Sequence, residues 1–100
     1  MLIVTGRVHV QSSDLDEFAA DIQALAHSSR QRDCNLFYGV AIDDALAGRR
    51  LVVERWRDQA SLAAHLNAPD TLAFMERWRE RMTGDILKYD AANERTLMDE

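Results

Sequence analysis

Apolar and polar residues alternate along some segments of this chain and recur at helical spacing in others. Residues 2–10 alternate between the two sides of an extended backbone, which predicts a β-strand. Residues 15–26 place apolar side chains three and four positions apart, which predicts an amphipathic helix. Asp14 precedes that helix and Glu17 follows three residues later, as in a capping box. The chain is therefore expected to begin with a strand and a helix.

A β-hairpin is predicted next. Residues 34–42 and 50–57 are rich in β-branched and aromatic side chains, and a turn at residues 43–48 separates them. Asp58 follows the second of these strands and is placed to cap a short helix that carries Leu62 and Leu66.

The remainder of the chain is predicted to form a further helix and a last strand. Pro69 breaks the short helix, and Asp70 starts a longer one that runs to about Met82. Thr83-Gly84 is expected to end this helix, and residues 86–92 are expected to form the final strand.

The order of these elements is β-α-β-β-α-β, with the second helix broken in two. It predicts an α+β fold of ferredoxin-like topology, in which a four-stranded antiparallel sheet carries its helices on one side. The chain has 100 residues, which suits one domain over residues 1–100. Its core is expected within residues 2–92, followed by a short acidic tail.

Both faces of the predicted strands are substantially apolar, whereas a sheet with one solvated face should carry polar residues there. On the third strand, Leu51 and Val53 oppose Val52 and Trp56. Leaving such a face in water would forfeit several kcal/mol at about 25 cal/mol per Å² of apolar area. We therefore expect a homodimer in which two copies pack sheet against sheet to form a dimeric α+β barrel.

Composition narrows the classes of function. Apolar residues make up 47% of the chain and charged residues 29%, which is typical of a globular domain. The net charge is −5, with arginines interleaved among acids, so nucleic-acid binding is not expected. Cys34 is the single cysteine, which excludes an intrachain disulfide or a Cys-pair zinc site. No apolar run approaches the roughly 20 residues of a membrane helix, and no signal-peptide pattern is found, so we expect a cytoplasmic protein.

The most specific sequence pattern spans the corner between the third strand and the next helix. Glu54 and Trp56 stand two residues apart, and His65-Leu66 follows on the helix. This E-x-W…H-L pattern resembles the antibiotic biosynthesis monooxygenase family, small dimeric α+β barrel proteins that include quinol monooxygenases. Residues 34–38 (Cys-Asn-Leu-Phe-Tyr) are similar to a strand opening of that family, although Asp33 stands where glycine is common. The resemblance covers about residues 2–92.

The resemblance implies oxygenation of a small hydroxylated aromatic, quinol- or anthrone-like, by O2 without metal, flavin or haem. Once deprotonated, such a substrate can itself reduce O2, so the protein needs a base, an anion stabiliser and a dry cavity. His65 suits the base, since its reference pKa lies near working pH. Trp56 offers a flat apolar wall and an indole N–H donor. We predict both to be catalytic, facing a chamber under the helices. The alternatives are a half-exposed surface or structural histidine and a core or interface tryptophan.

Three further residues are candidates for substrate binding. Tyr38 and Phe74 are expected to line the cavity, with packing in the core as the alternative for both. Gly6 removes a side chain from an apolar strand and so leaves room for a ligand, unless it marks a local bulge. Glu54 is expected to be structural, because a partly buried carboxylate needs a hydrogen-bonding partner.

Two other functions compete with this one. Haem-degrading enzymes share this fold and use an asparagine on the first strand, a tryptophan in the helical region and an axial histidine about ten residues beyond it. Here Gly6 and Arg7 occupy the first-strand positions. His65 stands near the expected tryptophan and Met75 near the expected histidine, so haem degradation is not expected. A non-catalytic binding or dimerisation module would instead have a filled or polar-mismatched pocket and His65 in solvent. The expected partners are a second copy, an aromatic substrate and O2, with no cofactor.

Overall fold

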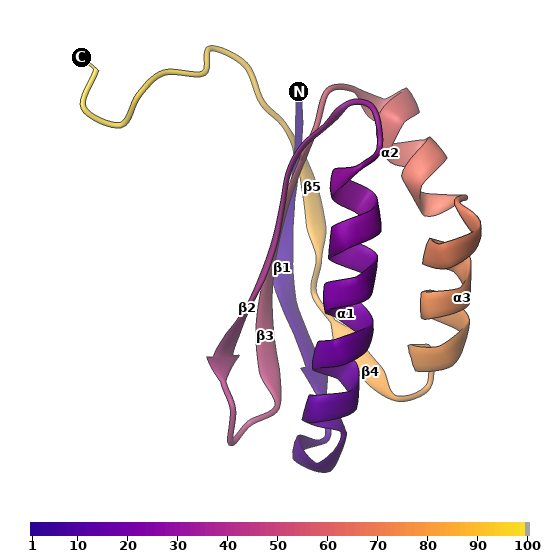
Figure 1. Cartoon of the computed structure of the whole chain (residues 1–100). Coiled ribbons are helices and arrows are strands. Elements are labelled where there is room, and N and C mark those ends of the chain that lie inside the picture. The colour runs from indigo at the N-terminus through magenta and orange to yellow at the C-terminus, as the bar shows by residue number, and fades with distance from the viewer. Residues whose placement is uncertain (100) are drawn as a thin grey trace.

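All the helices lie on one face of a single antiparallel sheet (Figure 1). The structure is a computed structural model that describes residues 1–99. Its elements, in chain order, are β1 (Leu2–Val10), the 3₁₀ turn η1 (Ser12–Asp14), α1 (Leu15–Arg30), β2 (Asn35–Asp44), β3 (Arg49–Trp56), α2 (Gln59–Leu66), α3 (Pro69–Trp78), β4 (Met82–Gly84) and β5 (Leu87–Asp90).

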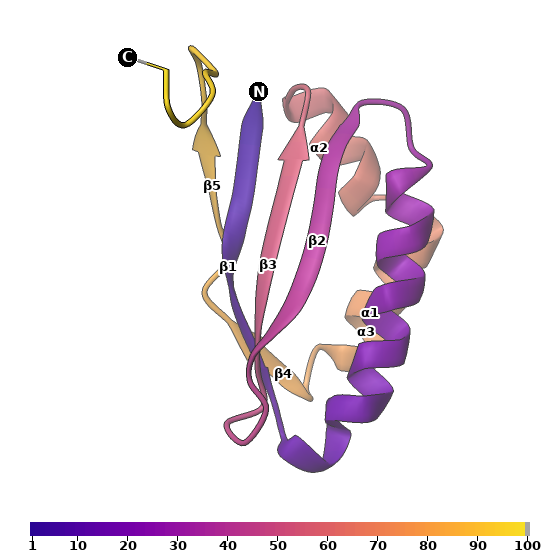
Figure 2. The ribbon, with the colours of Figure 1, turned by 60° about the vertical axis from the view of Figure 1, so that its left-hand side comes forward.

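The strand order is β2-β3-β1-β4, and β5 also pairs with β1. Figure 2 shows β5, β1, β3 and β2 side by side, with the helices behind them. The predicted α+β fold and ferredoxin-like arrangement are confirmed, and Asp58 caps α2 as expected, since its carboxylate accepts a hydrogen bond from the Ser61 amide at 2.8 Å.

The end of the chain differs from the prediction. Helix α3 stops at Trp78 and does not reach Met82, which instead begins the short strand β4. Trp78 is fully buried, and the Arg81 amide then donates to its carbonyl, turning the chain back toward β1. The final strand is therefore divided in two: β4 pairs with the end of β1 and β5 with its beginning.

The predicted capping box at the start of α1 is also wrong. The carboxylate of Asp14 makes no capping hydrogen bond to the helix. Instead, the Arg81 guanidinium donates to Asp14 at 3.2 Å and to Glu17 at 2.7 Å. These carboxylates therefore tie the start of α1 to the turn that follows α3.

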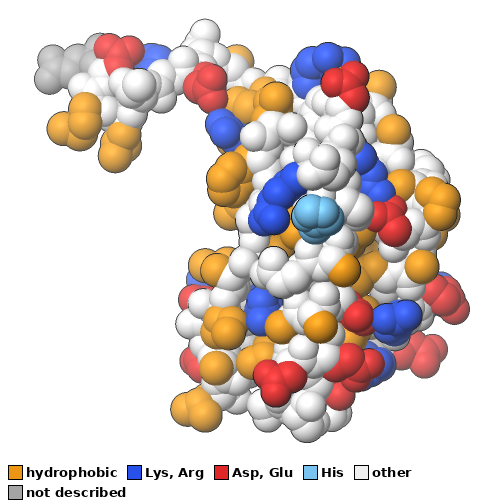
Figure 3. All heavy atoms as spheres, viewed as in Figure 1, with side chains coloured by type: hydrophobic (Ala, Val, Ile, Leu, Met, Phe, Trp, Pro, Cys, Tyr) orange, Lys and Arg blue, Asp and Glu red, His pale blue; other side chains and the backbone are white. Residues whose placement is uncertain are grey.

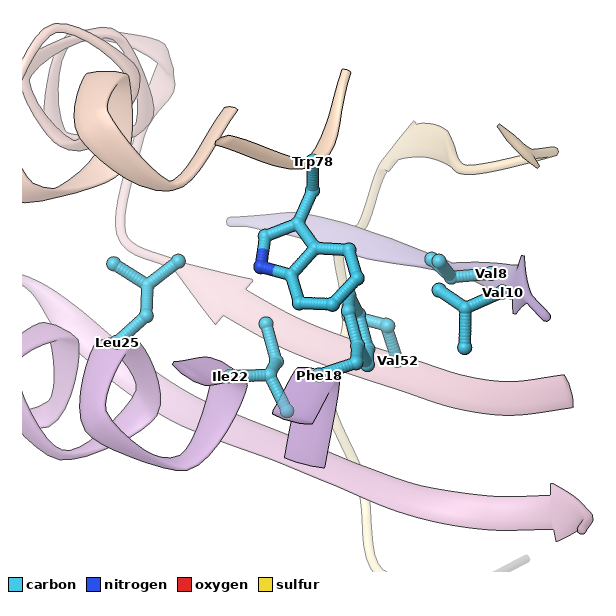
Figure 4. Packing of buried hydrophobic residues seen from close by; sticks show 7 residues of the cluster. All are labelled: Val8, Val10, Phe18, Ile22, Leu25, Val52 and Trp78. Atoms are coloured by element: carbon cyan, nitrogen blue, oxygen red, sulfur yellow. The ribbon is translucent and has the colours of Figure 1, made fainter. Parts of the chain in front are cut away.

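Two clusters of buried apolar side chains join the helices to the sheet. The first contains strand valines, three residues of α1 and one indole, shown in Figure 4: Val8, Val10, Phe18, Ile22, Leu25, Val52 and Trp78. Phe18 and Trp78 meet edge to face, with ring centroids 5.0 Å apart. The second cluster lies around the other end of the strands and comprises Leu2, Val4, Ala26, Tyr38, Trp56 and Leu62.

No element within residues 1–99 covers the other face of the sheet (Figure 1). Apolar side chains on that face remain exposed, including Phe37 at 47%, Leu51 at 39% and Val53 at 38%. This is the composition from which a sheet-to-sheet homodimer was predicted, and the dimer stays a prediction.

Charged side chains of both signs are interspersed over the face shown in Figure 3, without a broad basic area. Among residues 1–99, no helix combines the length and apolar character required to cross a bilayer.

Candidate functional site

A cavity of about 610 Å³ lies between the helices and the sheet, where the sequence predicted a chamber. Its volume falls within the range of roughly 300–1,000 Å³ that is usual for small-molecule sites. Members of both apolar clusters contribute to its wall, including Val4, Phe18, Val52 and Leu62. The polar side chains that reach it are Tyr38, Glu54, His65, Thr71 and Lys88. The space is therefore apolar, with its polar groups supplied by few side chains.

His65 is buried in the wall of this cavity, with 3% of its surface exposed. It belongs to α2, and the cap that starts this helix follows directly from β3. Its imidazole stacks on the indole of Trp56, with ring centroids 4.6 Å apart, and meets Tyr38 edge to face at 5.9 Å. The alternative of a histidine in solvent is thereby excluded.

The hydrogen bonds of His65 define its tautomer. Nη1 of Arg32 lies 2.6 Å from Nδ1 of His65. Because a guanidinium can only donate, Nδ1 must be the acceptor, and the ring proton sits on Nε2. Nε2 lies 3.9 Å from Oε1 of Glu54, so its N–H is close to that carboxylate but not yet hydrogen-bonded to it.

Burial lowers the pKa of His65 to about 4, with the nearby positive charge of Arg32 acting in the same direction and Asp70 partly opposing it. The imidazole is therefore neutral at neutral pH. A ring in this state can donate from Nε2, but its one lone pair is already committed to Arg32.

Arg32 was not singled out in the sequence. It lies just after α1, in a polar stretch without periodicity. Its guanidinium also donates to Oγ of Ser29 at 2.9 Å and forms an ion pair with Asp70 of α3. These contacts come from separate segments, so only the folded chain reveals that Arg32 holds the imidazole of His65.

Glu54 lies on β3 with 8% of its surface exposed, and it lines the cavity. Oε1 accepts a hydrogen bond from the indole Nε1 of Trp56 at 2.9 Å, which confirms the expectation that this carboxylate has a buried partner. Burial raises the pKa of Glu54, and the hydrogen bond from Trp56 opposes that rise. The cavity wall thus holds a carboxyl group whose proton affinity is raised.

The structure corrects the role predicted for Trp56. Its side chain is fully buried and lies outside the cavity wall, behind His65 and Glu54. Its indole N–H donates to Glu54 and is not free for a substrate. Trp56 therefore supports the two groups that line the cavity but forms no wall for an aromatic ligand.

Of the predicted substrate-binding residues, Tyr38 and Phe74 both line the cavity. Burial and the neighbouring Glu54 raise the pKa of the Tyr38 hydroxyl, so it remains a neutral donor. Phe74 packs against Phe18, with ring centroids 5.7 Å apart.

Gly6 does not line the cavity, and the space beside it is filled by backbone. A Cβ atom there would lie 2.7 Å from Cα of Ile86 and closer still to the carbonyl oxygen of Asp85. Gly6 therefore allows the chain between β4 and β5 to cross close to β1, and the predicted space for a ligand is wrong. In this same segment the Arg7 amide donates to the Asp85 carboxylate at 2.8 Å.

Thr71 and Lys88 are cavity residues that the sequence did not reveal. Lys88 lies on β5, whose exposed side chains gave no sign of a site, and its Nζ donates to Gln59 at 2.8 Å. Within residues 1–99, no group of three or more His, Cys, Asp or Glu side chains is arranged to hold a metal ion.

Comparison with known proteins agrees with this fold. The sequence model of a family described as "Antibiotic biosynthesis monooxygenase" matches residues 1–77. Among curated protein sequences, none matches this chain significantly.

Solved structures resemble the whole chain at low identity. A candidate antibiotic biosynthesis monooxygenase from Deinococcus radiodurans superposes with a TM-score of 0.88 at 23% identity, covering 99% of this chain and 100% of that one. A candidate of the same description from Nitrosomonas europaea gives 0.82 at 15% identity, covering 93% and 100%. A protein from Pseudomonas aeruginosa gives 0.82 at 20% identity, covering 92% and 94%. At these identities the likeness establishes the fold.

Proposed function

The chain belongs to the antibiotic biosynthesis monooxygenase family, and we propose that it transfers one oxygen atom from O2 to a small hydroxylated aromatic, quinol- or anthrone-like, without metal, flavin or haem. The observation that carries this proposal is the apolar cavity of about 610 Å³ between helices and sheet, which presents Glu54, His65 and Tyr38 to its interior. These side chains offer a carboxylate, a neutral imidazole and a neutral phenol, the groups needed to take a proton and stabilise an anion.

The proposed reaction balances with the substrate as the only reductant. An anthrone-like substrate loses a proton from its activated CH2 group to a base in the cavity wall. The carbanion passes one electron to O2, and the resulting radical and superoxide combine through a new C–O bond. The peroxide recovers the proton and loses water, so that one CH2 group and one O2 molecule give one carbonyl group and one water molecule. The apolar walls would keep the radical pair together and exclude competing water.

We also propose that the protein acts as a homodimer. The exposed apolar side chains of the open sheet face, such as Phe37 and Val53, favour burial against an identical face. A second sheet there would complete a barrel around the strands that carry the cavity wall.

Oxygen uptake with dithranol, an anthrone with an activated CH2 group, tests the proposed reaction. The protein should consume O2 faster than buffer alone, and with 18O2 one labelled atom should enter the new carbonyl group. Leu66→Trp should abolish the excess uptake, because Leu66 lines the cavity. Leu72→Trp is the matched control, since Leu72 is similarly half-exposed on a neighbouring helix but lies outside the cavity wall.

Binding of dithranol without faster O2 uptake would contradict the proposed reaction and leave a non-catalytic binding module. Uptake that yields hydrogen peroxide without labelled carbonyl would also contradict it, because the protein would then act as an oxidase and not as a monooxygenase.

A further inference from the structure

The polar side chains at the cavity form a continuous series that starts at the surface. Asp70 of α3 pairs with Arg32, and Arg32 donates to Nδ1 of His65 at 2.6 Å. Nε2 of His65 lies 3.9 Å from Oε1 of Glu54, which also accepts the N–H of Trp56 at 2.9 Å. Asp70 and Arg32 hold the imidazole of His65, whose Nε2–H points toward a carboxylate in the cavity wall that Trp56 holds.

This arrangement argues against His65 as the proton acceptor. Its lone pair on Nδ1 is already engaged by a guanidinium, and Nε2 carries a proton. Accepting a second proton would require Nδ1 to release Arg32 and would place a buried imidazolium beside the guanidinium cation. The ring is therefore held as a hydrogen-bond donor toward Glu54.

Glu54 has the free lone pairs that His65 lacks. Both donors near it, the indole of Trp56 and the Nε2–H of His65, approach Oε1. Within residues 1–99, Oε2 is neither hydrogen-bonded to a side chain nor sealed from the cavity. One oxygen thus anchors the carboxylate and the other remains available to a ligand.

We infer that Glu54 accepts the proton of the bound substrate through Oε2, while His65, fixed by Arg32, acts as a positioning residue that donates to Oε1. This inference rests on the proposed function and names the base for it. In the step, the C–H bond of the CH2 group breaks and its electron pair stays on carbon. The proton forms an O–H bond with the carboxylate, so a substrate anion and a neutral carboxylic acid result.

The surroundings of Glu54 suit this task. Burial raises its pKa toward neutral pH, where a carboxylate is a more effective base. The titratable groups beside it are Tyr38 from β2 and His65 from α2, with Arg32 beyond the imidazole, and Lys88 from β5 lines the same cavity. From β1 and α3 the cavity receives Val4 and Thr71, which do not titrate.

Deuterium exchange of the dithranol CH2 group tests the inference without O2. Under anaerobic conditions in heavy water, removal and return of the proton replaces hydrogen by deuterium, and proton NMR follows the loss of the CH2 signal. The wild-type protein should accelerate this exchange over buffer. Glu54→Gln should lower the acceleration by about 100-fold or more, which is the usual contribution of a general base. Glu54→Asp should recover part of it.

The positioning role of His65 predicts a different response. His65→Phe keeps an aromatic ring against Trp56 but removes the donor to Oε1. Exchange should persist at about a tenth of the wild-type rate, and its pH profile should move to higher pH, because a carboxylate that loses a donor is more readily protonated. Glu76→Gln makes the same chemical change as Glu54→Gln at an exposed position of α3, away from the cavity, and should leave exchange unchanged.

These measurements separate the inference from the proposed function. Exchange that depends on Glu54 but is not accompanied by oxygen uptake would support the base and refute the oxygenation. Oxygen uptake and exchange that survive in Glu54→Gln would overturn the inference and leave the oxygenation standing. The inference would also be overturned if His65→Phe lost all exchange while Glu54→Gln retained it. It would likewise be overturned if the wild-type protein did not accelerate exchange over buffer.

Discussion

The imidazole of His65 stacks on the indole of Trp56 with ring centroids 4.6 Å apart, although the first residue lies on α2 and the second ends β3. Because Trp56 is fully buried, it gives the imidazole a fixed surface to rest on. The same indole holds Glu54 through its N–H. The corner between β3 and α2 thus positions both groups through one side chain that never meets the cavity.

Trp56→Phe should test the hydrogen bond to Glu54. Phenylalanine retains an aromatic surface under His65 but leaves the buried carboxylate without its donor. We expect the free energy of unfolding at pH 7 to fall by about 2–4 kcal/mol, from the lost hydrogen bond and the smaller side chain. Trp78→Phe is the control. Trp78 is equally buried, and its indole N–H donates to Asp21. That carboxylate is partly exposed and would still be paired with Arg77 after the substitution. Denaturant unfolding should show the smaller loss for the control, and equal losses would contradict the prediction.

Acidification should destabilise the protein through His65. Its pKa is about 4 in the folded chain, below the ordinary value of 6.5, so the unfolded chain binds the proton first as the pH falls. Above about pH 6.5 the neutral imidazole makes its full contribution to the free energy of unfolding. This contribution is lost between about pH 6.5 and pH 4, and it amounts to roughly 3 kcal/mol. Glu54 has the opposite effect on the pH dependence of stability. Because its pKa is raised in the folded chain, protonation of its carboxylate at low pH favours the folded state. His65→Phe should remove this loss between pH 7 and pH 4, whereas His27→Phe, at an exposed position, should retain it.

Arg32→Met should raise the pKa of His65. The substitution removes the positive charge that opposes protonation and frees Nδ1 to accept a proton. The Cε1–H resonance of His65, followed by NMR across the titration, should report a midpoint above the wild-type value of about 4. Arg77→Met removes a guanidinium from a surface ion pair with Asp21, away from the imidazole, and should not move that midpoint.

Gly6→Ala should destabilise the fold strongly. The new Cβ would lie 2.7 Å from Cα of Ile86, and backbone cannot move aside as a flexible side chain can. We expect a loss of about 3 kcal/mol or more in the free energy of unfolding. Gly84→Ala is the comparison, since its nearest atoms would be the carbonyl oxygen of Arg7 at 3.1 Å and a methyl group of Val8 at 3.6 Å. A thermal unfolding midpoint in Gly6→Ala as high as in Gly84→Ala would refute the explanation.

Val53→Asp should disrupt the proposed homodimer. Val53 lies at the centre of the open sheet face, opposite Thr5 on β1 and Gly39 on β2. A carboxylate buried there without a partner would lose its hydration at a cost of several kcal/mol, so the dimer should dissociate. Light scattering after size-exclusion chromatography should give the mass of one chain. Leu46→Asp, in the exposed hairpin turn, should keep the mass of two, and a wild-type monomer would contradict the proposal.

Sequence periodicity was sufficient for the fold but not for the final strand. Alternation along β1 and helical spacing in α1 are local signals, and both elements formed as predicted. The segment at Met82–Gly84 has only three residues, too few for a pattern of alternation. It is a strand because it pairs with Val8–Val10, which lie far away in the sequence. Asp14 and Glu17 had the spacing of a cap, but a distant Arg81 competed successfully for both carboxylates.

The candidate site was predictable in part. The E-x-W…H-L pattern pointed to the correct corner, and His65 lies in the cavity wall as expected. The sequence could not show that Trp56 turns its N–H to Glu54, because the choice of hydrogen-bond partner depends on side-chain packing. Nor could it place Arg32, which reaches the imidazole from a polar segment 33 residues away.

The division between β4 and β5 lies beside the cavity, in the part of the sheet that pairs with β1. Ile86 and Leu87 lie at this division and also in the wall of the cavity. The four residues of β5 and the Ala91 amide, which donates to the Met1 carbonyl at 2.9 Å, join this margin of the sheet to the beginning of β1, while β4 is anchored separately near its end. Fraying of β5 would therefore widen access to the cavity without disturbing the packed helices. Such local unfolding costs less free energy than unfolding of the whole chain.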